Sequence, residues 1–146
     1  MRAIEATHRV KRIYLAGPYT HKDPVVMQDR FEFLTKVAVN LVSLGYFVFS
    51  PITHSHPLNL KLNIYEFAHW RSYDLIMIAE WADEVWVVPI DGWQESTGVI
   101  DEIRFTKEIG KLAIVLPQLL KEEYGSELPD SIVTLPKEKP KYYEYL

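Results

Sequence analysis

The sequence predicts an α/β protein with a single-domain, open, parallel five-stranded sheet and helices on both faces, of the flavodoxin or Rossmann-like type. Short apolar segments alternate with longer segments of helical periodicity along the 146-residue chain, as expected when parallel strands are joined by helices. Residues 84–90 (EVWVVPI) are almost continuously apolar, which is typical of a strand covered on both faces. There is no internal repeat and no linker, so we expect one domain over 1–146.

The five predicted strands are short and end at turn-forming residues. The first is Arg12–Ala16, stopped by Gly17 and Pro18. The others are, in chain order, residues 46–51 (YFVFSP), 84–90, 111–117 (KLAIVLP) and 131–136 (SIVTLP).

Helices are predicted between these strands. From Pro24 to Leu44 the apolar residues recur at helical spacing, and Gly45 follows where a C-terminal capping glycine belongs. Those apolar residues are Val26, Phe31, Leu34, Val37, Ala38, Leu41 and Val42. Further helices are expected at 64–82, 98–110 and 117–125, and a polar, His-rich surface loop at 52–63.

Two segments suggest contact with another subunit. The predicted helix 64–82 is apolar nearly all round, so we expect it to lie between the sheet and a second surface. Residues 136–146 form a charged, aromatic tail that we expect to pack on a neighbour.

Composition excludes several classes of protein. With 48% hydrophobic and 25% charged residues the chain is an ordinary globular sequence, and a net charge of −4 argues against nucleic-acid binding. Without cysteine it has no disulfide, thiol nucleophile or thiolate metal site. No signal peptide or long apolar segment is recognisable, so we expect a cytoplasmic protein, not bound to a membrane, with a small-molecule ligand.

In an open parallel sheet, ligands bind beyond the carboxyl ends of the strands, where the strand order reverses. For the expected strand order that point lies between the first and third strands. The loops that follow those strands, 16–23 (AGPYTHKD) and 89–98 (PIDGWQESTG), are rich in glycine and hydrogen-bonding residues, as a binding site requires.

Glu102 is the first candidate catalytic residue. On a helical projection it falls on the apolar side of 98–110, whereas Asp101, Arg104 and Glu108 lie opposite. A desolvated, ionised carboxylate near a helix N-terminus is suited to attack an electrophilic carbon. The same spacing also suits a glutamate at the margin of the apolar face that reaches solvent or pairs with a lysine.

Asp74 falls within an apolar stripe of its predicted helix, and buried carboxylates are rare unless paired. Arg71, Arg104 or a ligand hydroxyl is a possible partner, and a salt bridge across the helix surface is the alternative. Together, two inward carboxylates suit a mechanism with one nucleophile and one acid.

The remaining candidates surround the proposed cleft. Ser96, Thr97 and Gly98 form a turn suited both to capping a helix and to holding a phosphate or a sugar hydroxyl. Tyr19 and Trp93 are candidates to stack on a planar base, or else fill the core or an interface.

His54 and His56 are spaced for metal ligation, but the sequence offers no third ligand nearby, so no metal is expected. His54 is assigned to ligand contact, with an exposed position in the loop as the alternative. Neither a GxGxxG fingerprint nor a P-loop occurs, and no cofactor is expected.

Several of these segments, in this order, resemble the nucleoside 2-deoxyribosyltransferase superfamily, which includes the 2′-deoxynucleoside 5′-monophosphate N-glycosidases. The segments are IYLAGPY, Asp74 on a Trp-bearing helix, ADEVWVV, and GWQESTGVIDE followed by GKLAIVL. The resemblance extends over about residues 12–116. Its most specific part is Ser96-x-Gly98-x-x-x-Glu102, and the chain looks like an uncharacterised branch.

The resemblance implies roles for these residues. Glu102 falls on the family nucleophile, which forms a glycosyl ester that water or a second base resolves. Asp74 falls near the aspartate that assists at the base, while Gly17 and Tyr19 match the loop that frames sugar and base. Ser96 corresponds to a small hydroxyl residue of the monophosphate hydrolases, although Tyr19 and Thr20 stand where those enzymes have a basic residue. The family also implies a homodimer or homotetramer.

The sequence therefore predicts an enzyme that cleaves the N-glycosidic bond of a nucleoside or nucleoside 5′-monophosphate, without a cofactor. The alternatives are a non-catalytic nucleotide-binding module of the same fold, an NAD-cleaving glycosidase, and a metal-dependent hydrolase built on His54 and His56.

Overall fold

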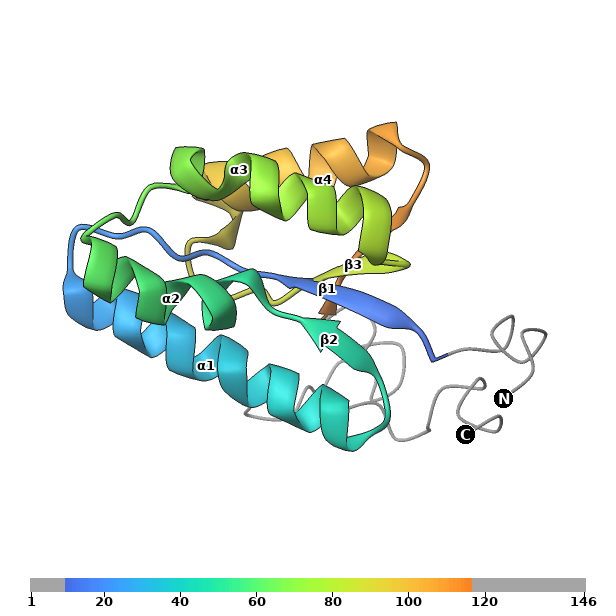
Figure 1. Ribbon diagram of the computed structural model, residues 1–146, viewed down its shortest axis with the longest axis horizontal. Coiled ribbons are helices and arrows are strands. Elements are labelled where there is room, and N and C mark those ends of the chain that lie inside the picture. The colour runs from blue at the N-terminus through green and yellow to red at the C-terminus, as the bar shows by residue number, and fades with distance from the viewer. Residues whose placement is uncertain (1–9, 117–146) are drawn as a thin grey trace.

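The computed structural model describes residues 10–116, which form a four-stranded parallel sheet in the order β2-β1-β3-β4 (Figure 1). The strands are β1 (Arg12–Ala16), β2 (Phe47–Phe49), β3 (Glu84–Val87) and β4 (Leu112–Val115). β1 is central: Tyr14 pairs with Phe49 on one side and with Val85 on the other. The order reverses between β1 and β3, so the crevice forms there.

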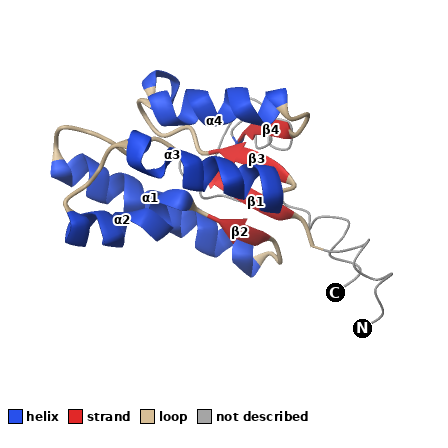
Figure 2. Ribbon diagram, turned by 45° about the horizontal axis from the view of Figure 1, so that its top comes forward, coloured by secondary structure: helices blue, strands red, loops and turns tan. Residues whose placement is uncertain are grey.

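The helices lie on both sides of the sheet. They are α1 (Pro24–Ser43), α2 (Pro51–Leu62), α3 (Phe67–Ile76), which continues as the π-helical turn η2 (Met77–Trp81), the short 3₁₀ helix η3 (Trp93–Glu95) and α4 (Thr97–Glu108). α1 and α2 lie on one side and α3 and α4 on the other (Figures 1 and 2). The predicted α/β, Rossmann-like architecture is confirmed.

The sheet has four strands where five were predicted. The predicted strand 131–136 falls outside the described residues, as do the predicted helix 117–125 and the aromatic tail 136–146. The first four predicted strands are present, each within its predicted segment.

The prediction of a loop over residues 52–63 is wrong, because the structure has helix α2 there. Ser50 caps this helix by accepting a hydrogen bond from the Thr53 amide (3.3 Å), and Pro51 occupies its first turn, where proline is tolerated. The sequence did not predict this helix because its buried side chains are mostly polar and several of its exposed side chains are apolar. Its buried residues besides Pro51 are polar (Ser55, His56 and Asn59), whereas Leu58, Leu60 and Leu62 are exposed.

The ends of α1 follow the sequence signals. Asp23 caps its start by accepting a hydrogen bond from the Val25 amide (2.9 Å). Gly45 follows its end with φ of +101°, a conformation that favours glycine, as predicted. Of the predicted apolar face, Leu34, Val37 and Leu41 are fully buried, but Val42 is exposed.

β1 separates two hydrophobic clusters because its side chains alternate. Ile13 and Leu15 pack on the α1 side, whereas Tyr14 and Ala16 pack on the side of α3 and α4. All four residues are fully buried. Within the described part of the chain, no helix has the length and apolar character needed to cross a membrane.

Candidate functional site

A cavity of about 1130 Å³ opens at the carboxyl end of the sheet. Its walls come from the loops that follow β1 and β3 and from helices α2, α3 and α4. It therefore lies at the β1–β3 switch point, where the sequence predicted a binding site.

Glu102 faces this cavity from α4 and is 4% exposed. The fully buried Tyr14 of β1 donates a hydrogen bond from its hydroxyl to Glu102 Oε2. Burial raises the pKa of Glu102 well above its usual value, and the Tyr14 hydrogen bond opposes this rise. The prediction that Glu102 faces inward is confirmed, and Tyr14 is the partner that such a carboxylate needs.

The expectation that the N-terminus of the helix stabilises Glu102 is wrong. α4 begins at Thr97, so Glu102 lies in the second turn. The free N–H groups and the dipole of a helix act on the first turn. The stabilising donor comes instead from the adjacent strand.

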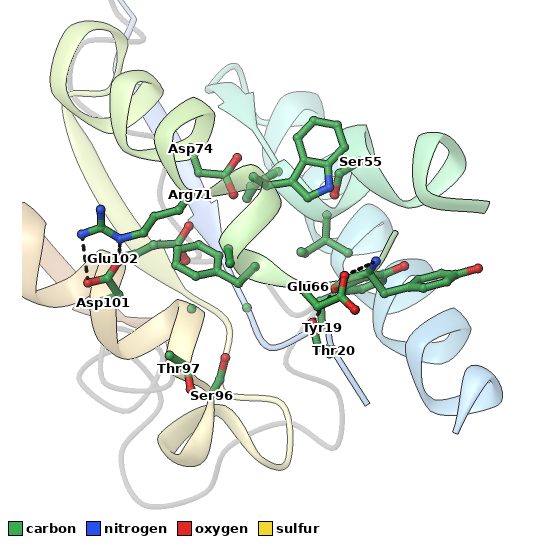
Figure 3. Close-up of a pocket in the computed structure, with 18 of the residues that line it drawn as sticks. Tyr19, Thr20, Ser55, Glu66, Arg71, Asp74, Ser96, Thr97, Asp101 and Glu102 are labelled. Atoms are coloured by element: carbon green, nitrogen blue, oxygen red, sulfur yellow. Dashed lines mark hydrogen bonds and ion pairs between the residues drawn. The ribbon is translucent and has the colours of Figure 1, made fainter. Parts of the chain in front are cut away.

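Asp74 approaches the same cavity from α3 and is 6% exposed. Burial raises its pKa to about 7. Arg71, predicted as a possible partner, instead binds Asp101, with Nε 2.6 Å from Oδ2. Within residues 10–116 no hydrogen bond or ion pair engages the Asp74 carboxyl group (Figure 3).

Ser96, Gly98 and Gly17 also line the cavity. The Ser96 hydroxyl caps α4 by accepting a hydrogen bond from the Val99 amide (3.3 Å), as expected. Both glycines permit close packing. A Cβ at Gly17 would lie 2.6 Å from Leu34 Cδ2, and one at Gly98 would lie 3.1 Å from the Phe67 ring.

Tyr19 lines the cavity and is fixed by a buried histidine. Its hydroxyl bonds His56 Nδ1 (2.6 Å), and His56 Nε2 bonds Gln28 Oε1 (2.8 Å). Because both nitrogens of His56 are engaged, this residue acts as a bridge between α2, α1 and the loop after β1. No group of three metal-ligating side chains occurs within residues 10–116.

His54 and Trp93, both predicted to bind the ligand, do not line the cavity. His54 is exposed and stacks on Tyr73 of α3, with ring centroids 5.3 Å apart. Trp93 packs against the hydrophobic cluster under α3 and α4. Of the eight predicted site residues, the other six line the cavity.

A model of one protein family, described as a domain of unknown function (DUF1937), matches residues 11–117. The chain belongs to this family. The matched region contains the whole sheet, its helices and every residue that lines the cavity. No curated protein matches the chain.

Two residues of this DUF1937 domain that shape the site were missed from the sequence. Arg30 of α1 joins both switch-point loops: its Nη1 donates to the carbonyl oxygens of Tyr19 and Thr20 (3.3 Å each), and its Nη2 to that of Asp91 (3.0 Å). Nothing in the local sequence indicates these contacts. Tyr14 was detectable, because it is the one residue with a polar tip in the otherwise apolar centre of a buried strand.

Proposed function

We propose that this DUF1937 protein cleaves the N-glycosidic bond of a nucleoside or nucleoside 5′-monophosphate, by hydrolysis or base exchange, through a covalent glycosyl-Glu102 intermediate. One observation carries the proposal. The Glu102 carboxyl group is buried, accepts a hydrogen bond from Tyr14, and shares a cavity with the buried Asp74.

In the first step a Glu102 carboxylate oxygen attacks the anomeric carbon of the sugar. The bond between that carbon and the base nitrogen breaks, and the base leaves with the electron pair. Asp74 donates a proton to the departing base. Water or a second base then attacks the anomeric carbon and releases Glu102, while Asp74 recovers its proton.

The hydrogen bonding of the two carboxyl groups favours this division of roles. Asp74, with a pKa of about 7, holds its proton in much of the population at neutral pH and is suited to be the acid. Glu102 is the one that accepts a hydrogen bond, and such a bond favours the ionised form. Burial raises the pKa of Tyr14 well above 10, so its hydroxyl remains a donor.

The choice of substrate rests on the cavity and on the resemblance. At about 1130 Å³ the cavity lies just above the range of about 300–1000 Å³ that is typical of small-molecule sites, so it is large enough for a nucleotide. Ser96, which resembles the small hydroxyl residue of monophosphate hydrolases, favours a 5′-phosphorylated substrate. The exposed Tyr73 and Ile76 of α3 are consistent with a homodimer or homotetramer.

One observation favours a second candidate, a nucleotide-binding module without turnover. Burial and the nearby Asp74 and Asp101 all raise the pKa of Glu102, and a protonated carboxyl group is a poor nucleophile. In that case the cavity binds a nucleotide and Glu102 only shapes it.

The test is release of free base from nucleosides and 5′-monophosphates, ribo and deoxy, by wild type, Glu102→Gln and Glu108→Gln. Glu108 is exposed near the end of the same helix and serves as the matched control. We expect wild type and Glu108→Gln to release base and Glu102→Gln to be at least about 1000-fold slower, since the nucleophile is lost. Nucleotide binding by calorimetry, without base release by any of the three proteins, would instead support the binding module.

A further inference from the structure

Helix α2 lines the cavity on the side away from Glu102, with the apolar Pro51 and Ile52 and the polar Ser55 and Asn59 (Figure 3). Ser55 and Asn59 lie one turn apart on α2 and are 5% and 1% exposed. Tyr19 and the Trp70 indole line the cavity with them. The proposed reaction assigns no role to Ser55 or Asn59.

The orientation of the Asn59 amide is fixed by Trp70. The indole nitrogen can only donate, and Trp70 Nε1 lies 2.8 Å from Asn59 Oδ1. The second polar atom of the amide is therefore the donor Nδ2. The Trp70 hydrogen bond thus distinguishes the nitrogen of this amide from its oxygen.

This donor has no partner. Asn59 Nδ2 is buried without a hydrogen bond, and the structure gives the Ser55 hydroxyl none among residues 10–116. The Tyr19 hydroxyl is an acceptor nearby: burial raises the pKa of Tyr19 and the Asn59 amide lowers it. The two groups do not meet in hydrogen-bonding geometry, so Nδ2 remains unpaired. An unsatisfied buried donor destabilises a protein, so it calls for an explanation.

A ligand supplies the missing acceptor if it is flat enough to lie beside the Trp70 indole. If a sugar is held at Glu102, the rest of the cavity extends toward α2 (Figure 3). A base placed there would present to Ser55 and Asn59 the edge farthest from the glycosidic bond. In 6-oxopurines and in 4-oxopyrimidines that edge carries a carbonyl oxygen next to a ring N–H. The carbonyl complements the Asn59 donor, and the ring N–H complements the Ser55 hydroxyl oxygen.

We propose that the α2 wall, formed by Ser55 and Asn59, is the base subsite, and that it selects bases with a carbonyl group at this edge over their amino counterparts. This inference rests on the proposed function and specifies its substrate class. In an amino base an NH₂ group meets the Asn59 NH₂ group, so two donors face each other and the buried donor stays unsatisfied. Discrimination of about 10–100-fold is expected from such a mismatch.

The test is calorimetric binding of free bases, which needs no turnover. Hypoxanthine is compared with adenine, and uracil with cytosine, on wild type. Asn59→Asp replaces the donor with an acceptor and is expected to invert the preference. Asn63→Asp adds the same charge at the exposed end of α2 and is the matched control, expected to leave the preference unchanged.

A second variant guards against misfolding of Asn59→Asp. Trp70→Phe removes the indole N–H and frees the amide to turn, so it should abolish the preference while bases still bind. Equal affinities within each pair on wild type, no binding of any free base, or an unchanged preference in both Asn59→Asp and Trp70→Phe would overturn the inference.

Each proposal fails separately. Binding of oxo bases without cleavage of any nucleoside would leave the base subsite standing and remove the glycosidase. Cleavage without a preference for oxo bases would leave the glycosidase and remove the α2 wall as its selector.

Discussion

The two sides of the sheet bury side chains of different character. On the α1 side, strand residues such as Ile13 and Leu15 meet Leu34, Val37 and Leu41, and none of the described residues there buries a carboxyl group. On the side of α3 and α4, the sheet is just as tightly covered, but the buried residues include the polar groups of Tyr14, Asp74 and Glu102.

The difference separates stability from chemistry. Burying apolar surface stabilises the fold by about 25 cal/mol per Å², so the α1 side holds the sheet together. A buried carboxyl group favours its neutral form and opposes folding when it ionises. The buried carboxyl groups on the α4 side therefore lower the stability of the fold at neutral pH. The proposed reaction is a reason for keeping them there.

Asp74→Asn tests this comparison with the largest expected effect. Because the folded-state pKa is about 7 against 3.8 for a free carboxyl group, the folded state binds the proton more tightly than the unfolded state. Protonation of Asp74 therefore stabilises the wild-type fold at low pH. This contribution to the free energy of unfolding is lost as the pH rises from about 4 to 7. We expect the variant to be more stable by about 2–4 kcal/mol at pH 7.5 and about 100- to 10,000-fold slower in base release.

Urea unfolding at pH 4.5 and pH 7.5, alongside the base-release assay, checks both parts. The gain should shrink at pH 4.5, where the wild-type carboxyl is protonated. A variant that is less stable than wild type at both pH values would mean that Asp74 has a structural role. It would contradict the statement that buried carboxyl groups lower the stability of the α4 side.

Leu41→Ala tests the α1 side. Leu41 is fully buried, and its removal leaves a cavity, so the free energy of unfolding should fall by about 2–5 kcal/mol. The pH profile of base release should keep its shape, because the residue lies far from the cavity-lining part of α1. Val39→Ala, at an exposed position of the same helix, should change stability by less than about 0.5 kcal/mol.

Tyr14→Phe has the smallest expected effect and tests the role of β1, which supplies the hydrogen bond to Glu102. Loss of the hydroxyl removes the group that favours ionised Glu102, so the pKa of Glu102 should rise. We expect base release at neutral pH to fall about 10- to 100-fold, and the acidic limb of the pH–rate profile to move to higher pH. A uniform fall in rate with an unmoved acidic limb would contradict this role for Tyr14.

Periodicity predicted most of the fold because most elements bury apolar residues. The turn residues Gly17 and Pro18 marked the end of the strand Arg12–Ala16, and spacing placed Glu102 on the apolar side of its helix. α2 was missed for the opposite reason. Its inward residues Ser55, His56 and Asn59 are polar, so no apolar face at helical spacing marks this helix in the sequence.

The site was predicted less completely, since its contacts join distant parts of the chain. The Tyr14–Glu102 hydrogen bond connects residues 88 positions apart, and no local pattern indicates it. Trp93 and His54 were assigned to the ligand because their types suit base recognition. Trp93 instead packs on the hydrophobic cluster, and the exposed His54 stacks on Tyr73 of α3.

The Arg30 guanidinium has a consequence for engineering this fold. It bonds carbonyl oxygens in the loop after β1 and in the loop after β3, and a Cβ at Gly92 would come within 2.8 Å of its Nη2. The two loops are thus joined into one unit by hydrogen bonds from a residue of α1, packed against one glycine. A library that randomises either loop, or a chimera that transplants one from a relative, retains a shaped cavity only if it keeps Arg30 and Gly92 together.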